Sequence, residues 1–384
     1  MFYRSSPHLP NRFGVYIHTP YCVHKCSYCD FFSFTSYQES DFRPFTNKLI
    51  LELTQSASWL SSLGYREPLH SIFIGGGTPS LFPTDEIHRI LDTVLEAFPA
   101  EDGIEITLEA NPETVTEVFS KQLSKTPVNR ISLGAQSFQE AHLKTLERLG
   151  SGESIVTAIN RLKEVGFQRL NLDLIFGIPG QSPDQMVQDI HKTVALGPEH
   201  ISSYQLTLKP GHPLYDRLPS DETSADLYEL AVSTLRQSGF LQYEISNFCR
   251  ENGESRHNLL YWDGGDYLGV GPSAASRFFS DGKFYHRKSW SDMNRYFSSG
   301  TFPDPVFQES SLEQSLLEAT FLELRKNVGV DIARFQGRYG FNLTSARNFP
   351  LFLKEGLIET DGQRIRLTDR GRLLADRVTR DLVD

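Results

Sequence analysis

The stretch VYIHTPYCVHKCSYCDFF, residues 15–32, joins an apolar β-strand pattern to a tight group of cysteines. Cys22, Cys26 and Cys29 follow the strand with the spacing C-x3-C-x2-C, whereas the fourth cysteine of the chain, Cys249, lies far away in the sequence. In a reducing compartment, cysteines clustered in this way are typical of a metal-binding or catalytic site rather than of a disulfide framework. This loop is therefore the first candidate for a functional site.

The composition is that of an ordinary globular protein, with 39% hydrophobic and 22% charged residues among 384. The net charge of −10 argues against a nucleic-acid partner, because phosphate binding draws on clustered Lys and Arg. No apolar run reaches the roughly 18 residues that a membrane helix needs, and the first residues lack the apolar core of a signal peptide. We expect a cytoplasmic protein that is not an integral membrane protein.

Strand and helix patterns alternate along the first 240 residues, and apolar residues recur at helical spacing between the strands. The expected strands are 14–19, 71–74, 103–109, 130–134, 169–176 and 200–208. Such alternation predicts parallel strands joined by crossover helices. The fold class is therefore α/β, with a partial (β/α)6 barrel of the TIM type, short of the eight units of a closed barrel.

The chain divides into three regions by sequence pattern. Residues 1–240 are expected to form the barrel core, and residues 241–305 form an irregular region rich in Gly, aromatic residues and His. For residues 306–384 the sequence predicts two or three helices, a hairpin that turns at Asp361-Gly362 and a final helix. This pattern is typical of a winged-helix-like module.

Three thiolates are compatible with two kinds of metal centre. Structural zinc prefers four closed ligands, and His18 or His24 could complete a Cys3His site. Cubane iron–sulfur clusters are normally held by four thiolates, so three would leave one iron with a free coordination position. Cys249 could supply a fourth thiolate, but a lone cysteine is more often a small buried side chain. The spacing favours an iron–sulfur cluster.

Polar residues and glycines also mark the ends of the later strands, where barrels of this type collect their chemistry. A glycine triplet follows the second strand, Glu109 ends the third, and Asp173 interrupts an apolar run in the fifth. A charged residue in such a run is costly without a partner. The residues singled out on these grounds are Gly75, Gly76, Gly77, Glu109, Gln136, Arg148 and Asp173.

The C-x3-C-x2-C motif, with the aromatic Tyr28 before its last cysteine, resembles that of the radical S-adenosylmethionine (SAM) superfamily. In that superfamily three cysteines hold a [4Fe–4S] cluster, and the free iron binds the amino and carboxylate groups of SAM. The resemblance implies that Cys22, Cys26 and Cys29 are the metal ligands and that the cluster and SAM are cofactors.

Further motifs narrow the resemblance to the HemN/HemW group, over nearly the whole chain. They are GGGTPS (75–80), TLEANPE (107–113), ISLGAQSF (131–138) and NLDLIFGIPGQ (171–181). The group's pattern implies that SAM contacts Tyr16, Gly76 and Glu109. Further SAM contacts implied in the same way are Tyr28, Gly77, Thr78, Gln136, Arg148, Asp173 and Thr207.

Two features separate the branches of this group. The coproporphyrinogen dehydrogenases carry another cysteine two places after the third, where this chain has Phe31. The segment HNLLYW, residues 257–262, matches a signature associated with haem handling, which makes His257 a candidate axial ligand. On the residues alone, a structural role is favoured, in which His257 hydrogen-bonds to the backbone of a glycine-rich loop, and it is the family signature that favours haem.

The resemblance implies a haem chaperone that passes haem to respiratory-chain haemoproteins and lacks coproporphyrinogen oxidase activity. The alternative within the group is an oxygen-independent coproporphyrinogen III dehydrogenase, which decarboxylates a porphyrin precursor. A zinc-stabilised scaffold without redox chemistry is the third hypothesis. The sequence leaves open whether the protein associates peripherally with a membrane and whether it forms a homodimer.

Overall fold

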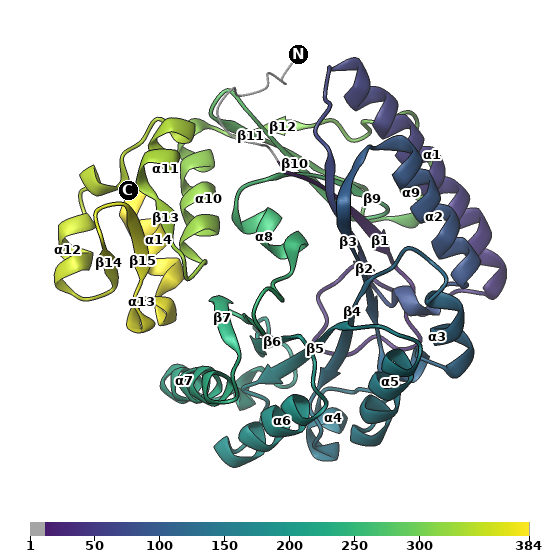
Figure 1. The fold of residues 1–384 in the computed structure, drawn as a ribbon, viewed down its shortest axis with the longest axis horizontal. Coiled ribbons are helices and arrows are strands. Elements are labelled where there is room, and N and C mark those ends of the chain that lie inside the picture. The colour runs from purple at the N-terminus through teal and green to yellow at the C-terminus, as the bar shows by residue number, and fades with distance from the viewer. Residues whose placement is uncertain (1–11, 384) are drawn as a thin grey trace.

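A computed structural model describes residues 12–383, and six parallel strands form its centre (Figure 1). Each strand pairs with the next in chain order, as a β/α barrel requires. The strands are β1 (Phe13–Thr19), β2 (Leu69–Gly76), β3 (Ala100–Ala110), β4 (Arg130–Gln136), β5 (Arg169–Phe176) and β6 (His200–Gln205). The predicted partial barrel is confirmed, although β6 is shorter than the predicted 200–208.

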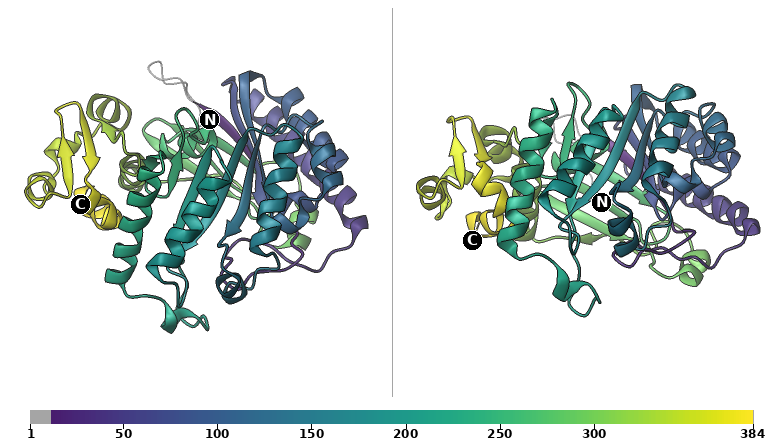
Figure 2. Two further views of the ribbon diagram at one scale, coloured as in Figure 1. Left: turned by 60° about the horizontal axis from the view of Figure 1, so that its bottom comes forward. Right: turned by 90° about the horizontal axis from the view of Figure 1, so that it is seen from below.

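The connecting helices form a layer on the outer face of these strands (Figures 1 and 2). They are α1 (Phe42–Ser62), α2 (Thr84–Ala97), α3 (Glu117–Leu123), α4 (Glu140–Thr145), α5 (Gly152–Glu164), α6 (Pro183–Ala195) and α7 (Asp221–Gln237). Apolar residues of the helices and of the strands' outer faces share one large core. Arg148, one of the residues singled out from the sequence, lies just beyond α4, which ends at Thr145.

Residues 241–305 are more regular than the sequence predicts. Six short strands extend the sheet beyond both ends of the barrel, so that β8 pairs with β6 and β9 pairs in parallel with β1. They are β7 (Leu241–Glu244), β8 (Asn247–Cys249), β9 (Asp266–Val270), β10 (Ala275–Ser280), β11 (Lys283–Lys288) and, just past this region, β12 (Gln308–Glu309). Strands this short, interrupted by glycines, give too little periodicity to be recognised.

Two short helices accompany these strands, α8 (Arg256–Trp262) and α9 (Met293–Ser298). Helix α8 lies on the concave inner side of the sheet, between the barrel strands and the C-terminal module (Figure 1). The side chain of Glu105, in β3, accepts hydrogen bonds from the backbone N–H groups of Arg256 and His257 at 3.0 and 3.1 Å. A carboxylate at this helix start satisfies N–H groups that have no partner within the helix.

The C-terminal module has its own apolar core around Phe335 and Phe352 and a three-stranded antiparallel sheet. Its elements are α10 (Leu312–Leu324), β13 (Val330–Asp331), α11 (Ile332–Tyr339), α12 (Phe349–Lys354), β14 (Ile358–Thr360), β15 (Arg364–Leu367), α13 (Asp369–Leu373) and α14 (Ala375–Val383). The expected hairpin is present, with Asp361 and Gly362 between β14 and β15. The module lies beside α7 at the open side of the barrel (Figures 1 and 2).

None of the helices in the described part of the chain is both long and apolar enough to cross a membrane.

A buried carboxylate on α1 ties the barrel to the strands that extend its sheet. Glu52 accepts hydrogen bonds from Arg287 Nη2 at 3.0 Å and from the Tyr296 hydroxyl at 3.0 Å. It also accepts one from the backbone N–H of Gly271 at 2.9 Å. Because both charged side chains are almost fully buried, each depends on the other for compensation.

Replacing Glu52 by Ala should lower the free energy of unfolding by about 3–5 kcal/mol, because Arg287 would be left as a buried, uncompensated cation. Chemical denaturation of the two proteins measures the difference. Glu96→Ala, at an exposed position of α2, serves as control and should stay within about 0.5 kcal/mol of the wild type. Equal losses in both variants would show that the buried pair has no special role.

Candidate functional site

The three clustered cysteines lie on the loop that follows β1, and they line one cavity of about 420 Å³. Cys22 is buried, whereas Cys26 and Cys29 are partly exposed. A tight turn brings the second and third cysteines together, since the N–H of Cys29 donates to the carbonyl of Cys26 at 3.1 Å. We call residues 20–34 the cysteine loop and this space the cysteine cavity.

The ends of the cysteine loop are held together by backbone hydrogen bonds. The N–H of Cys22 donates to the carbonyl of Phe34 at 3.1 Å, and the N–H of Phe34 donates to the carbonyl of Pro20 at 2.9 Å. The Tyr21 side chain anchors this closure in an aromatic cluster with Phe34, Tyr37, Phe42, Phe45 and Phe82. The loop thus has a fixed base from which its cysteines project.

The glycine turn after β2 fastens the loop to the neighbouring strand. The N–H of Gly77 donates to the carbonyl of Thr19 at 2.6 Å, and the N–H of Thr78 donates to the carbonyl of Tyr21 at 2.8 Å. A Cβ atom on Gly77 would lie 2.6 Å from the Tyr21 carbonyl oxygen, so any side chain there would push the loop away. The Thr78 hydroxyl donates to Cys22 Sγ at 3.5 Å.

Most of the residues singled out from the sequence meet in the cysteine cavity. Besides the three cysteines, its lining includes Tyr28, Gly76, Gly77, Thr78, Glu109, Gln136, Arg148, Asp173 and Thr207. Apart from Arg148, which follows α4, they lie in the barrel strands or in the loops that follow them, where parallel strands converge.

The sequence analysis missed other polar residues that line the same cavity. These are Asn111, Arg130, Ser132, Asn171, Ser202 and Asn258. Strand alternation could have found some of them, because Asn171 lies two residues before Asp173 and so shares its face of β5. The position of Asn258 on a helix inside the barrel has no comparable signal.

Tyr16 and His257 do not line the cavity. The Tyr16 hydroxyl is 3.0 Å from His18 Nδ1, and the Tyr16 ring stacks on Phe73, which does line it. His257 stacks on the same ring, with centroids 5.2 Å apart. Phe73 therefore lies between these two residues and the cavity. The assignments of Tyr16 to SAM and of His257 to haem stay predictions.

His257 is buried at 1% exposure, and both its ring nitrogens have hydrogen-bond partners. Nδ1 lies 2.8 Å from the Ser71 hydroxyl oxygen, and Nε2 lies 2.8 Å from the Tyr261 hydroxyl oxygen. Burial lowers the pKa of His257 to about 3, so its imidazole is neutral at pH 7. A metal could reach this imidazole only after one of these hydrogen bonds had been broken.

Two carboxyl groups face the cavity. Glu109 accepts a hydrogen bond from the N–H of Gly76 at 3.0 Å. Burial, together with the nearby charge of Asp173, raises the pKa of Glu109 to about 8. Asp173 accepts from Asn171 Nδ2 at 2.7 Å, and burial raises its pKa against the effect of that bond. A cation bound in the cavity would therefore favour the ionised forms of these two carboxyl groups.

Arg148 brings a positive charge to the cysteine loop. Its Nη2 donates to the carbonyl of Gly134 at 2.8 Å and to Asn111 Oδ1 at 3.0 Å. Its Nη1 lies 3.9 Å from Cys26 Sγ. Burial raises the pKa of the Cys26 thiol, and the Arg148 charge opposes that rise. A guanidinium fixed in this position favours a thiolate, the form in which cysteine binds metal.

A segment after β6, residues 206–218, covers the outer side of the cysteine loop. His212 Nδ1 accepts from the N–H of Leu214 at 3.0 Å, so Nε2 carries the proton and donates to the carbonyl of Ser27 at 3.1 Å. Lys209 Nζ pairs with an Asp30 carboxylate oxygen at 2.8 Å. The Tyr28 ring packs against the small apolar cluster that contains Leu206 and Leu208.

Cys249 lies away from the cysteine loop. It is buried in β8 and pairs with His200, which begins β6, whereas the cysteine cavity lies at the strands' opposite ends. Burial raises the pKa of its thiol to about 12. Its placement agrees with the expected role of a small buried side chain.

The donor set fits an iron–sulfur cluster. Three cysteines line one cavity, and each iron of a cubane can take a single thiolate. Among residues 12–383, no three His, Cys, Asp or Glu side chains stand close enough together to hold a single metal ion. His18, which could have completed a zinc site, has hydrogen-bond partners at both ring nitrogens, the Tyr16 hydroxyl and the Phe32 carbonyl.

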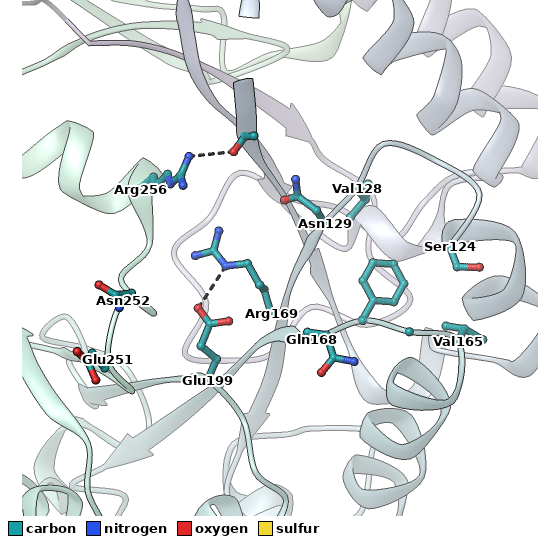
Figure 3. A pocket seen from close by; sticks show the side chains of 13 residues that line it. Ser124, Val128, Asn129, Val165, Gln168, Arg169, Glu199, Glu251, Asn252 and Arg256 are labelled. Atoms are coloured by element: carbon teal, nitrogen blue, oxygen red, sulfur yellow. Dashed lines mark hydrogen bonds and ion pairs between the residues drawn. The ribbon is translucent and has the colours of Figure 1, made fainter. Parts of the chain in front are cut away.

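A second, wider cavity of about 840 Å³ opens at the other end of the strands (Figure 3). Its arginines are already paired. Arg169 Nε donates to Glu199 Oε1 at 3.2 Å, and Arg256 Nη1 donates to the carbonyl of Gly103 at 2.9 Å (Figure 3). None of the site residues predicted from the sequence lines this cavity.

Comparisons with known proteins agree with the geometry of the cysteine cavity. The radical SAM superfamily matches residues 16–193, and the HemN C-terminal domain matches residues 311–374. A Mycobacterium tuberculosis protein named haem chaperone HemW is 35% identical over 379 residues, 97% of this chain and 95% of that protein. The Bacillus subtilis protein of the same name is 33% identical, over 95% of this chain and 97% of that protein.

Among solved structures, coproporphyrinogen III oxidase (HemN) from Escherichia coli superimposes with a TM-score of 0.79. The match covers 98% of this chain and 91% of that chain at 21% identity, which shows a common fold. The family assignment rests on the full-length matches above 30% identity. The chain belongs to the HemW family of the radical SAM superfamily.

Proposed function

We propose that this protein is a haem chaperone, which binds haem, a [4Fe–4S] cluster and SAM and delivers the haem to respiratory-chain haemoproteins. The observation that carries the proposal is the full-length similarity to proteins named haem chaperone HemW, together with three cysteines on one cavity. Phe31, which is 60% exposed on the cysteine loop, supports it, because the dehydrogenases of this group have a further cysteine there.

The cluster would be held by Cys22, Cys26 and Cys29. Bound there, it supplies one-electron chemistry whose potential depends on hydrogen bonds and charges near the sulfurs. This chain provides both, because the Thr78 hydroxyl donates to Cys22 Sγ and Arg148 lies beside Cys26. The segment after β6 holds the outer side of the loop through Ser27 and Asp30.

SAM would occupy the cavity beside the cysteine loop. Its ammonium group suits Glu109, whose carboxylate form a neighbouring cation stabilises. The ribose hydroxyls suit Asp173, Asn171 and Ser202, which are polar groups on adjacent strands of the same cavity. A binding role for these residues accounts for the presence of buried ionisable side chains that have no ion-pair partner among residues 12–383.

The alternative function is oxygen-independent coproporphyrinogen III dehydrogenation. The shared fold with Escherichia coli HemN keeps this alternative in view, since the same barrel supports it there. The two functions differ in outcome: a chaperone retains and transfers haem, whereas the dehydrogenase converts a porphyrin precursor in the presence of SAM and a reductant.

Anaerobic reconstitution tests the cluster. Wild-type protein should bind about four irons per chain, as a cubane contains, and each of Cys22→Ser, Cys26→Ser and Cys29→Ser should lose most of that iron. Cys249→Ser is the matched control and should keep the wild-type iron content. A colourless protein with a single zinc would contradict the proposal, as would loss of iron in Cys249→Ser alone.

A haem titration run beside a turnover assay separates the two functions. Wild-type protein should show a Soret band at micromolar haem and should form no protoporphyrinogen from coproporphyrinogen III, SAM and a reductant. His257→Ala should weaken the band if its imidazole is the axial ligand, and Ser71→Ala, which frees Nδ1, should keep the band. Robust turnover by the wild type would establish the dehydrogenase instead.

The raised pKa of Glu109 predicts a pH effect on the ligand-free protein. Between pH about 4.5 and 8 the folded protein holds a proton on Glu109 that the unfolded chain has released, so stability should fall as pH rises. Denaturation across this range should show a smaller fall for Glu109→Gln than for the wild type. Parallel curves for the two proteins would place the pKa of Glu109 near its ordinary value.

A further inference from the structure

Arg130 is a buried cation without a hydrogen-bond or ion-pair partner in the described part of the chain. It begins β4, is 3% exposed and lines the cysteine cavity. Within residues 12–383, no hydrogen bond or ion pair reaches its guanidinium group. That group carries five N–H donors, and buried donors of this kind nearly always have acceptors. The absence of an acceptor for the Arg130 guanidinium among these residues therefore needs a physical explanation.

Other arginines around the barrel are satisfied. Arg169, which pairs with Arg130 in the strand register, lies 3.1 Å from Glu105 and 3.2 Å from Glu199. Arg148 donates to Gly134 and Asn111, and Arg256 donates to Gly103, as Figure 3 shows for the latter. Arg130 thus differs from its neighbours, and packing of the strands does not account for it.

The nearby carboxylates have other partners. Glu105 pairs with Arg169 and accepts from the backbone N–H groups at the start of α8. Asp173 accepts from Asn171 at 2.7 Å and from Ser132 at 3.4 Å. The charge of Arg130 helps to lower the pKa of Glu105 and opposes the rise that burial causes in the pKa of Asp173, but neither carboxyl group is in contact with it. Its hydrogen-bonding capacity is left for the contents of the cavity.

Asn258 lines the same cavity from α8, and no side chain or backbone group of residues 12–383 pairs with its side-chain amide. A guanidinium and an amide N–H₂ group that line one cavity supply N–H donors of the kind that carboxylate oxygens accept. We propose that Arg130, assisted by Asn258, binds a carboxylate of the ligand in the cysteine cavity. This inference rests on the proposed function, which provides two carboxylate-bearing ligands, SAM and haem with its propionates.

The test compares Arg130→Met with the wild type in cluster-loaded protein. Dissociation constants for SAM, haem and haem dimethyl ester are measured in parallel. The ligand whose carboxylate Arg130 holds should bind about tenfold more weakly or worse to the variant, and the other should bind as before. Arg256→Gln is the matched control and should change neither affinity, because Arg256 lines the wider cavity and not the cysteine cavity.

The ester identifies the source of the carboxylate. If the carboxylate is a haem propionate, the wild type should bind the ester about as weakly as Arg130→Met binds haem. If it belongs to SAM, haem and its ester should bind alike, and only SAM should lose affinity. A residue that merely balanced charge inside the barrel would lower stability without selecting one ligand.

Unchanged affinities for both ligands in an Arg130→Met protein with normal iron content would overturn the inference. If that variant does not fold, Asn258→Asp replaces it, because the added carboxylate competes for Arg130 and should weaken the same ligand. Unchanged affinities in Asn258→Asp would then overturn the inference. A wild type that binds neither ligand contradicts the proposed function and this inference with it, whereas a normal wild type with indifferent variants contradicts the inference alone.

Discussion

The attachment of the cysteine loop to the turn after β2 is the constraint on which the site depends. Two backbone hydrogen bonds, from Gly77 to Thr19 and from Thr78 to Tyr21, fix the start of the loop against the neighbouring strand. A side chain at Gly77 would collide with the backbone of the loop. The attachment of the cysteine loop to this turn keeps the cysteines facing Arg148 and the carboxyl groups of the inner strands.

The interior of the barrel has a low dielectric constant and contains several charged side chains. Their arrangement depends on which of them are paired with a side chain of opposite charge. Glu105 and Arg169 neutralise each other at the start of the strands, and the same carboxylate holds the first turn of α8. Toward the other end, burial raises the pKa of Glu109 and Asp173. Arg130, at the start of β4, and these two carboxyl groups have no ion-pair partner among residues 12–383, and all three line the cysteine cavity.

The sequence was a good guide wherever a residue's place followed from strand order. The cysteines follow the first strand, and Glu109, Gln136 and Asp173 lie near the ends of later ones, so their convergence could be predicted from the parallel topology. The direction of His257 could not, because it depends on how α8 packs inside the barrel against Ser71. The short strands of residues 241–305 were missed because they are too short to show periodicity, and because β8 and β9 join the sheet by pairing with β6 and β1, which lie far away in the sequence.

Strand β1 is paired on both of its edges, and this affects how the chain folds while it is being synthesised. One edge of β1 pairs with β2, but the other edge can pair only after β9, which spans Asp266–Val270, has been synthesised. At elongation rates of roughly 5–20 residues per second, the interval is on the order of ten seconds or more. During that time an apolar strand exposes unsatisfied backbone groups, which invite aggregation. The nascent chain, with its cysteines already outside the ribosome, is therefore a natural client for cellular folding factors.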